Sequence, residues 1–199
     1  MKLLPLLLMV LLSGCNQSNE KEKEKPIPSP LPQVTEIIKT PELIEELKAQ
    51  PTIDDQFSML YDKFDHILDR SESLTGPDEN NDGIRDDIGA FIDALEVTEP
   101  VRNALKQNAR YTQENLYHDW SEKTEANIVK AMRMGDKYNK VIACKKFVGI
   151  DVDDRINTSN TITALTYNTK ARTMAYLKYN HLQDGSVSTL LPAEAKHCE

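Results

Sequence analysis

The sequence lacks the clusters of basic residues on which nucleic-acid-binding proteins depend. Its 199 residues include 24 Lys and Arg against 32 Asp and Glu, which gives a formal net charge of -8 at pH 7. Phosphate backbones attract clustered positive charge and repel an acidic surface. Nucleic acid is therefore excluded as an expected partner, and direct binding to an anionic lipid surface is disfavoured for the same reason.

Signatures of common enzyme classes are also missing. The four histidines are scattered and show no HExxH-type spacing that would place two of them on one helical face for zinc. No G-x-S-x-G, P-loop or Rossmann signature occurs. Active sites without a local motif do exist, so an enzyme stays open as an alternative, while a non-enzymatic role is favoured.

The chain has no apolar run of the roughly 20 residues that a transmembrane helix needs. A short run extends from Leu3 to Leu12, after the single charge of Lys2 and before the small residues Ser13 and Gly14. A basic tip, a short apolar core and small residues before a cleavage site are typical of an export signal. We therefore predict that residues 1–14 are a signal peptide.

The end of this run, Leu12-Ser13-Gly14-Cys15, resembles the lipobox of bacterial lipoproteins. The resemblance implies that a diacylglycerol is attached to Cys15, that cleavage precedes this residue, and that the new amine is acylated, for example with palmitate. Several acyl chains anchor a protein durably. In that family Asp after the Cys favours inner-membrane retention in some bacteria. Asn16 therefore implies that the protein is anchored at the periplasmic face of the outer membrane, and the alternative location is the inner membrane. The alternative to a lipobox is an ordinary secretory signal in which Cys15 occurs by chance.

A polar stretch that becomes Pro-rich follows Cys15 and ends at Gln33. It offers almost nothing that a hydrophobic core could bury, so we expect residues 15–33 to be a disordered tether. Residues 34–199 are long enough for one domain with its own core.

Apolar residues spaced three and four apart predict helices in this domain. The first helix begins at Pro41 and ends at Pro51, because proline suits a first helical turn and interrupts a helix interior. The second follows Asp54 as its N-cap and continues to about Leu68. A third begins near Asp86.

Further helix signals occupy the second half of the domain. Thr98-Glu99-Pro100 combines a capping hydroxyl with an acid and a proline in the first turn, and two helices are expected from there to Phe147. One helix should extend from about Ser159 to Gln183 and stop at Asp184-Gly185. Strand-like alternation is confined to Val148–Val152. The sequence thus predicts an all-α fold, a single helical bundle-like domain.

Two cysteines remain once Cys15 carries lipid. In an oxidising compartment an even pair predicts one disulfide, between Cys144 and Cys198. The alternative is a nucleophilic thiol at Cys198 beside His197, but sequence neighbours rarely form a catalytic pair and a terminal tail excludes water poorly.

The acidic loop, residues 78–87, has oxygen-bearing side chains at positions 1, 3, 5, 9 and 10 and glycine at position 6. Calcium takes six to eight oxygens, and glycine permits the tight turn. The loop resembles the calcium loops of EF-hand, dockerin and thrombospondin type 3 proteins. The resemblance implies calcium as a structural cofactor, with these ligands: Asp78, Asn80, Asp82, the Ile84 carbonyl, and Asp86 or Asp87.

The loop also departs from the EF-hand pattern. Gly89 occupies position 12, where an EF-hand has its bidentate acid, and Pro77 interrupts any helix that enters the loop. The alternative is a solvated acidic turn that precedes a helix. A second acidic cluster, Asp151 to Asp154, could also hold a metal ion. It lacks the glycine, however, and such a cluster more often marks a turn before a helix than a metal site.

The stretch Pro77–Asp87, followed by a helical domain, also resembles uncharacterised exported proteins of gram-negative bacteria. This resemblance implies no particular activity. Two hypotheses follow. The first is a membrane-anchored periplasmic lipoprotein whose calcium-stabilised helical module binds an envelope protein or has a structural role. The second is a hydrolase or small-ligand-binding protein with a site between helices. Such a site needs a polar cleft. His118-Asp119 together with Arg172, Tyr176 and Tyr179 could line one, although aromatic residues at helical spacing more often belong to the core.

Overall fold

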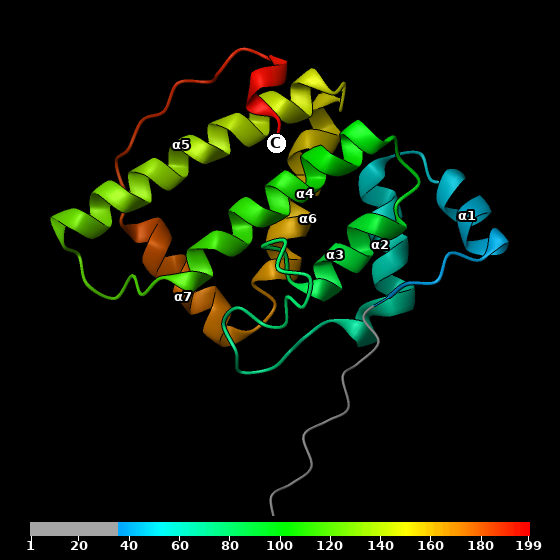
Figure 1. The fold of residues 1–199 in the computed structure, drawn as a ribbon, viewed down its shortest axis with the longest axis horizontal. Helices are drawn as coiled ribbons and strands as arrows, with labels where there is room; N and C mark the ends of the chain where they lie inside the picture. The colour runs from blue at the N-terminus through cyan, green and yellow to red at the C-terminus, as the bar shows by residue number, and fades with distance from the viewer. Residues whose placement is uncertain (1–35) are drawn as a thin grey trace, which may run out of the picture. The chain divides into compact units, whose positions relative to one another are not determined.

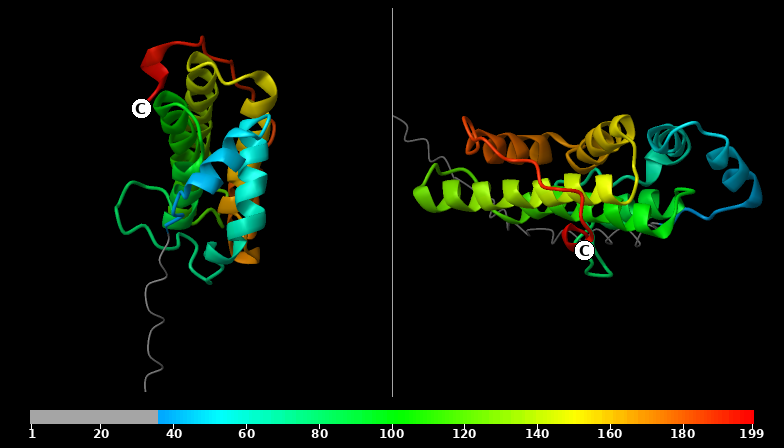
Figure 2. Two further views of the ribbon diagram at one scale, coloured as in Figure 1. Left: turned by 90° about the vertical axis from the view of Figure 1, so that its right-hand side faces the viewer. Right: turned by 90° about the horizontal axis from the view of Figure 1, so that it is seen from above.

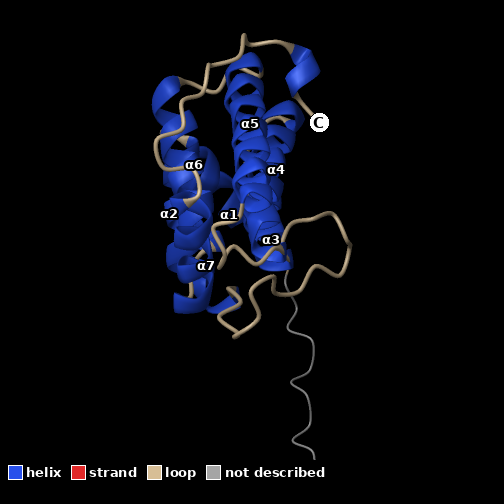
Figure 3. Ribbon diagram, turned by 90° about the vertical axis from the view of Figure 1, so that its left-hand side faces the viewer, coloured by secondary structure: helices blue, strands red, loops and turns tan. Residues whose placement is uncertain are grey.

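Helices form the regular structure of residues 36–199, which are the residues that the computed structural model describes (Figure 1). The α-helices are α1 (Pro41–Lys48), α2 (Ile53–Phe64), α3 (Asp86–Ala94), α4 (Glu99–Glu114), α5 (Glu125–Phe147), α6 (Val152–Thr166) and α7 (Lys170–His181). Three short 3-10 helices are η1 (Asp65–Ile67), η2 (Asn115–Tyr117) and η3 (Ala195–His197). The described residues include no strand (Figure 3), and they belong to one compact unit. The all-α, single-domain prediction is confirmed, whereas the signal peptide, Cys15 and the tether lie outside the described residues.

Threonine side chains begin four of the helices. Thr40, Thr52, Thr124 and Thr169 each have extended backbone and accept a hydrogen bond from the N–H three residues later. Such caps satisfy N–H groups that have no partner inside the helix. The predicted cap at Asp54 is wrong, because Thr52 caps α2 and Asp54 lies in its first turn.

The long helix expected from Ser159 to Gln183 is two helices. α6 ends at Thr166, and α7 begins again after Thr169, so the apolar stripe that suggested one helix crosses a break. The predicted strand-like segment is the turn between α5 and α6, where Gly149 has a left-handed φ of 84°. The two helices expected between residue 99 and Phe147 are present as α4 and α5.

The helices are arranged in two layers (Figure 2). α4 and α5 run side by side in one layer together with α3, and α2, α6 and α7 form the other layer, an arrangement that is also seen in Figure 3. α4 is central, because it packs against α3, α5 and α6. None of the helices in the described part combines the length and apolar character needed to cross a bilayer.

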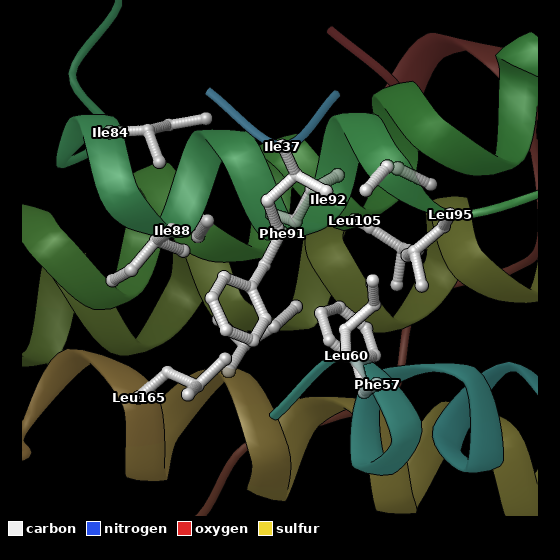
Figure 4. Close-up of a cluster of buried hydrophobic side chains, with 14 of the residues drawn as sticks. Ile37, Phe57, Leu60, Ile84, Ile88, Phe91, Ile92, Leu95, Leu105 and Leu165 are labelled. Carbon is white, nitrogen blue, oxygen red and sulfur yellow. The ribbon is translucent and has the colours of Figure 1, made fainter. Parts of the chain in front are cut away.

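The main core lies between these layers. Its buried side chains come from every α-helix except α7, and Figure 4 shows Phe57, Leu60, Phe91, Leu105 and Leu165 converging from α2, α3, α4 and α6. Each of these side chains has at most 4% of its surface exposed. A second, smaller cluster around Trp120 and Tyr179 joins α5 and α7. Burial of these apolar groups is the main favourable contribution to folding.

Candidate functional site

The acidic loop follows η1 in the sequence, ends in the first turn of α3 and is folded by its own side chains. The two carboxylate oxygens of Asp78 accept the backbone N–H groups of Asp82 and Gly83, each at 3.1 Å. The side-chain oxygen of Asn80 accepts the N–H of Asp82 at 3.0 Å. Gly83 has a φ of 80°, in the left-handed region that glycine adopts without strain. The sequence was therefore right that this glycine makes a tight turn.

The two acids at the end of the loop point in different directions. Asp86 accepts the N–H of Glu79 with both oxygens, at 3.1 and 3.2 Å, and so faces the loop. Asp87 is fully buried, and its oxygens accept hydrogen bonds from Arg85 and from the N–H of Asp69. This corrects the inclusion of Asp87 among the candidate ligands, because Asp86 is the one of the two that faces the loop.

The remaining candidate ligand is the carbonyl of Ile84. The Ile84 side chain is 1% exposed and belongs to the core (Figure 4), while its carbonyl accepts no hydrogen bond within residues 36–199. Side-chain and backbone oxygens are the donors that calcium prefers. In the same residues, however, no three Asp, Glu, His or Cys side chains lie close enough together to hold a metal ion.

Two buried arginines tie the loop region to the other helix layer. Arg85 donates to the carbonyls of Leu165 and Thr166, at 2.9 and 3.2 Å, at the C-terminal end of α6. Carbonyls at a helix end have no intrahelical partner and carry partial negative charge, so a guanidinium satisfies them well. This role of Arg85 could not be predicted from the sequence, since nothing local distinguishes it from an exposed arginine.

Arg172 holds the segment before the loop. Its guanidinium donates to the carbonyls of Asp69, Ser73 and Leu74 and to the Asp69 carboxylate. Burial acts to raise the pKa of Asp69, but the N–H and hydroxyl of Ser71 and the Arg172 guanidinium outweigh it and lower that pKa overall. Arg172 is thus a structural residue of the interior, not the groove residue that the sequence suggested.

The second acidic cluster consists of helix caps. Asp151 is the N-cap of α6 and accepts the N–H groups of Asp153 and Asp154. The Asp154 carboxylate accepts the N–H groups of Ile53 and Asp54, at 2.9 and 3.1 Å, and so caps α2 from about a hundred residues away. These acids satisfy helix N-termini, which explains their position without a metal.

The two predicted disulfide partners are bonded. The Sγ atoms of Cys144 and Cys198 are 2.02 Å apart, which fixes the C-terminal segment against α5. Gln107 of α4 strengthens this attachment by donating to the carbonyl of His197 at 2.8 Å. Cys198 is therefore not a free thiol, and the catalytic alternative for it is wrong.

Lys145, next to this disulfide, is buried without an ion-pair partner in the described residues. Only 1% of it is exposed, and its ammonium group donates to Asn108 Oδ1, the Arg155 carbonyl and Ser159 Oγ at 2.8 to 3.1 Å. Burial disfavours the charged form and lowers the pKa of Lys145 to about 7. This cluster could not be predicted from the sequence, because its members come from α4, α5 and α6.

A cleft between α4 and α5, the α4–α5 cleft, brings ionisable groups together. It has a volume of about 350 Å³. Its lining residues are Gly83, Gln107, Arg110, Tyr111, Glu114, Tyr117, Lys137, Lys140, Val141 and Glu199. It therefore has the convergent titratable groups that the ligand-binding hypothesis requires. None of these side chains was predicted from the sequence to line a site.

His118 and Asp119 line a second cleft, beside α7. The Lys130 ammonium lies 3.0 Å from His118 Nδ1, and the Asn127 amide oxygen lies 2.9 Å from Nε2. An ammonium group can only donate, so Nδ1 accepts and Nε2–H donates to Asn127. Both ring nitrogens are occupied in this arrangement. The predicted groove at His118-Asp119 exists, but Arg172, Tyr176 and Tyr179 do not line it.

Comparison with protein-family models, with curated proteins and with solved structures finds no match to this chain.

Proposed function

We propose that this protein is a non-enzymatic lipoprotein of the bacterial envelope, anchored through Cys15 to the periplasmic face of the outer membrane. Its helical domain has a structural role or binds an envelope protein, and the acidic loop binds calcium as a structural ion. The lipobox-like residues 12–15 support the anchor, and the oxygen-rich composition of the loop supports calcium.

The observation that carries the structural role is the attachment of the loop to the interior. Arg85, at the end of the loop, reaches the C-terminus of α6, and Arg172 of α7 binds Asp69 before the loop. A cation that orders the loop would therefore also order the junction of α3, α6 and α7. Binding requires the carboxylates of Asp78, Asp82 and Asp86 to converge on the ion.

The arrangement of the buried charges supports a structural role of the domain. The buried charges of Arg85, Asp87 and Arg172 are used in bonds that hold segments together.

Calorimetry and thermal unfolding of the mature chain test the calcium proposal. At 1 mM calcium and a Kd of about 10⁻⁴ M, binding adds about 1.4 kcal/mol, which raises the Tm by about 4 °C. Asp78→Ala combined with Asp82→Ala should abolish the binding heat and this shift. Asp62→Ala combined with Glu72→Ala removes two exposed charges outside the loop and should leave both unchanged. An equal Tm of the native chain in calcium and in chelator would refute the stabilising role.

Metabolic labelling with palmitate and membrane fractionation test the anchor. Cys15→Ala should abolish labelling and release the protein from the outer membrane. Asn16→Asp should keep the label and move the protein to the inner-membrane fraction. If Cys15→Ala is still labelled and still sediments with the outer membrane, the proposal for Cys15 fails.

A further inference from the structure

The segment of residues 186–194, which we call the C-terminal strap, connects α7 to η3 and contains no helix, turn or bend. Figure 1 shows it in red as one long loop that leads from α7 to η3. Residues 187–193 exchange no backbone hydrogen bond with any other residue in the described part of the chain. A strap side chain contacts the helices through a single weak hydrogen bond in this part, from Ser188 Oγ to Asn139 Oδ1 at 3.4 Å. The backbone of the strap is therefore free to bind another molecule.

The strap also presents large apolar side chains to solvent. Val187 is 95% exposed and Leu190 is 71% exposed. An endoprotease binds its substrate as an extended strand, forms hydrogen bonds to the substrate backbone, and inserts a side chain next to the cleaved bond into a pocket. Exposed loops are the usual sites of such cuts. The strap meets both requirements without any local unfolding.

Other exposed apolar residues do not combine these two features. Leu177 is 48% exposed, but it lies within α7, where the backbone is hydrogen-bonded inside the helix. Leu74 is 38% exposed and lies in a loop, but its carbonyl accepts a hydrogen bond from Arg172 Nε at 3.0 Å. A protease would have to break these bonds before it could bind either segment. The strap is therefore the preferred substrate.

The strap lies inside the loop that the disulfide closes, since Cys144 precedes it and Cys198 follows it. A disulfide stabilises a protein mainly by closing such a loop in the unfolded chain. A cut within the strap opens this loop, although the sulfur–sulfur bond stays intact. The residues after the cut remain attached to Cys144, and the hydrogen bond from Gln107 to the His197 carbonyl also holds them.

We propose that the C-terminal strap is a site of limited proteolysis for an endoprotease that prefers an apolar residue before the cleaved bond. Hydrolysis of the Leu190–Leu191 bond consumes one water molecule and leaves a carboxylate on Leu190 and an amine on Leu191. The disulfide keeps residues 191–199 attached but no longer closes a loop. One cut therefore removes the stabilisation by the disulfide without releasing a fragment. The inference is independent of calcium binding and of the lipid anchor.

Brief digestion of the folded mature chain with chymotrypsin, followed by intact-mass measurement before and after reduction, tests the position of the cut. Chymotrypsin cuts after leucine and aromatic residues unless proline follows. Residues 16–35 contain one such residue, Leu31, and it precedes Pro32, so this segment should stay intact. The first product should gain the mass of one water molecule. After reduction it should separate into a large fragment that ends at Leu190 and a peptide of residues 191–199.

Matched variants identify the cleaved bond. Leu190→Ser should slow the first cut about tenfold, because the pocket of the protease loses its apolar side chain. Leu177→Ser, the same change at an exposed position of α7, should leave the rate unchanged. Pro192→Ala should be cut at the same bond at least as fast, which keeps the test valid if Pro192 hinders the enzyme. A first cut at any other bond, or equal effects of the two leucine variants, would overturn the proposal.

Thermal unfolding of the cut protein tests the consequence for stability. The Tm of the cut, unreduced protein should be lower than that of the uncut protein and close to that of the uncut protein in dithiothreitol, because both lack the closed loop. The helix content, measured by circular dichroism below the Tm, should stay the same. An unchanged Tm after the cut would refute the loss of stabilisation by the disulfide.

Discussion

Arg85 and Asp87 form an ion pair in which neither side chain is exposed to solvent. Arg85 Nε lies 2.6 Å from one carboxylate oxygen of Asp87, and Nη2 lies 2.9 Å from the other. The guanidinium also binds two carbonyls of α6, and the carboxylate also binds the N–H of Asp69. The pair therefore connects the segment before the acidic loop, the start of α3 and the end of α6.

Removal of one member of this ion pair should lower the free energy of unfolding more than removal of both members. Asp87→Leu leaves the buried Arg85 charge uncompensated and should lower the free energy of unfolding by about 3–5 kcal/mol. Arg85→Met combined with Asp87→Leu leaves no buried charge and should cost less than Asp87→Leu alone. Urea unfolding measures all three proteins. A double variant less stable than the single variant would show that the hydrogen bonds to the backbone matter more than the charge balance.

Gly76 should tolerate alanine much less well than Gly149. Both have left-handed backbone, with φ of 67° and 84°. A Cβ on Gly76 would overlap the Arg85 side chain and lie 2.7 Å from Asp69 Oδ2, whereas a Cβ on Gly149 would meet nothing within 4 Å.

Gly149→Ala should therefore cost only the conformational penalty of about 1 kcal/mol, and Gly76→Ala at least twice that, because it also displaces the buried arginine. Thermal unfolding of both variants provides the measurement. Similar losses in Tm would mean that Arg85 moves aside at little cost.

Stability should rise with pH above neutrality because of Lys145. The folded pKa of about 7 lies below the unfolded value of 10.5, so the unfolded chain binds more protons between these values and unfolding becomes less favourable as the pH increases. Between pH 7 and pH 9 the gain should be about 2 kcal/mol. Lys145→Met should abolish this gain when urea unfolding is measured at both pH values.

The measurement must stay below pH 10, because burial raises the pKa values of Tyr111 and Tyr167. Their neutral forms stabilise the fold, and this contribution is lost at higher pH as the tyrosines of the unfolded chain ionise. Lys146→Met, at an exposed position, serves as the control and should retain the pH dependence of the native protein. A flat profile for the native protein between pH 7 and pH 9 would mean that Lys145 stays protonated in the folded state.

Loss of the disulfide should destabilise the whole domain. Cys144 and Cys198 are 54 residues apart in the sequence, and a crosslink that closes such a loop contributes about 4 kcal/mol by restricting the unfolded chain. Cys144→Ser combined with Cys198→Ser should lower the free energy of unfolding by this order. Reduction of the native protein should have the same effect, and reduction of the double variant none. No change on reduction would show that the contacts of the tail, such as Gln107 with His197, suffice.

Local sequence determined most of the helices. Proline suits a first helical turn and threonine suits an N-cap, so α1 and the start of α4 could be predicted from Pro41 and Thr98-Glu99-Pro100. Thr98 is the N-cap of α4, but its side chain makes no capping hydrogen bond, so the predicted capping hydroxyl is wrong. The spacing of apolar residues predicted helix boundaries less well where one apolar stripe continues across two helices, as in α6 and α7. The break at Tyr167–Thr169 combines a tertiary contact, in which the Tyr167 hydroxyl donates to the carbonyl of Thr112 in α4, with a local one, in which Thr169 caps α7.

By itself the sequence determined the all-α fold, the pairing of Cys144 with Cys198 and the oxygen-rich composition of the acidic loop. Only the tertiary structure decided that Asp86 faces the loop while Asp87 enters the core, that Lys145 is buried, and that Lys140 and Gln107 share a cleft. The physical reason is distance along the chain. Caps, turns and amphipathic faces depend on neighbours within a few residues, whereas the environment of a charge is set by residues such as Leu165, 80 positions from Arg85.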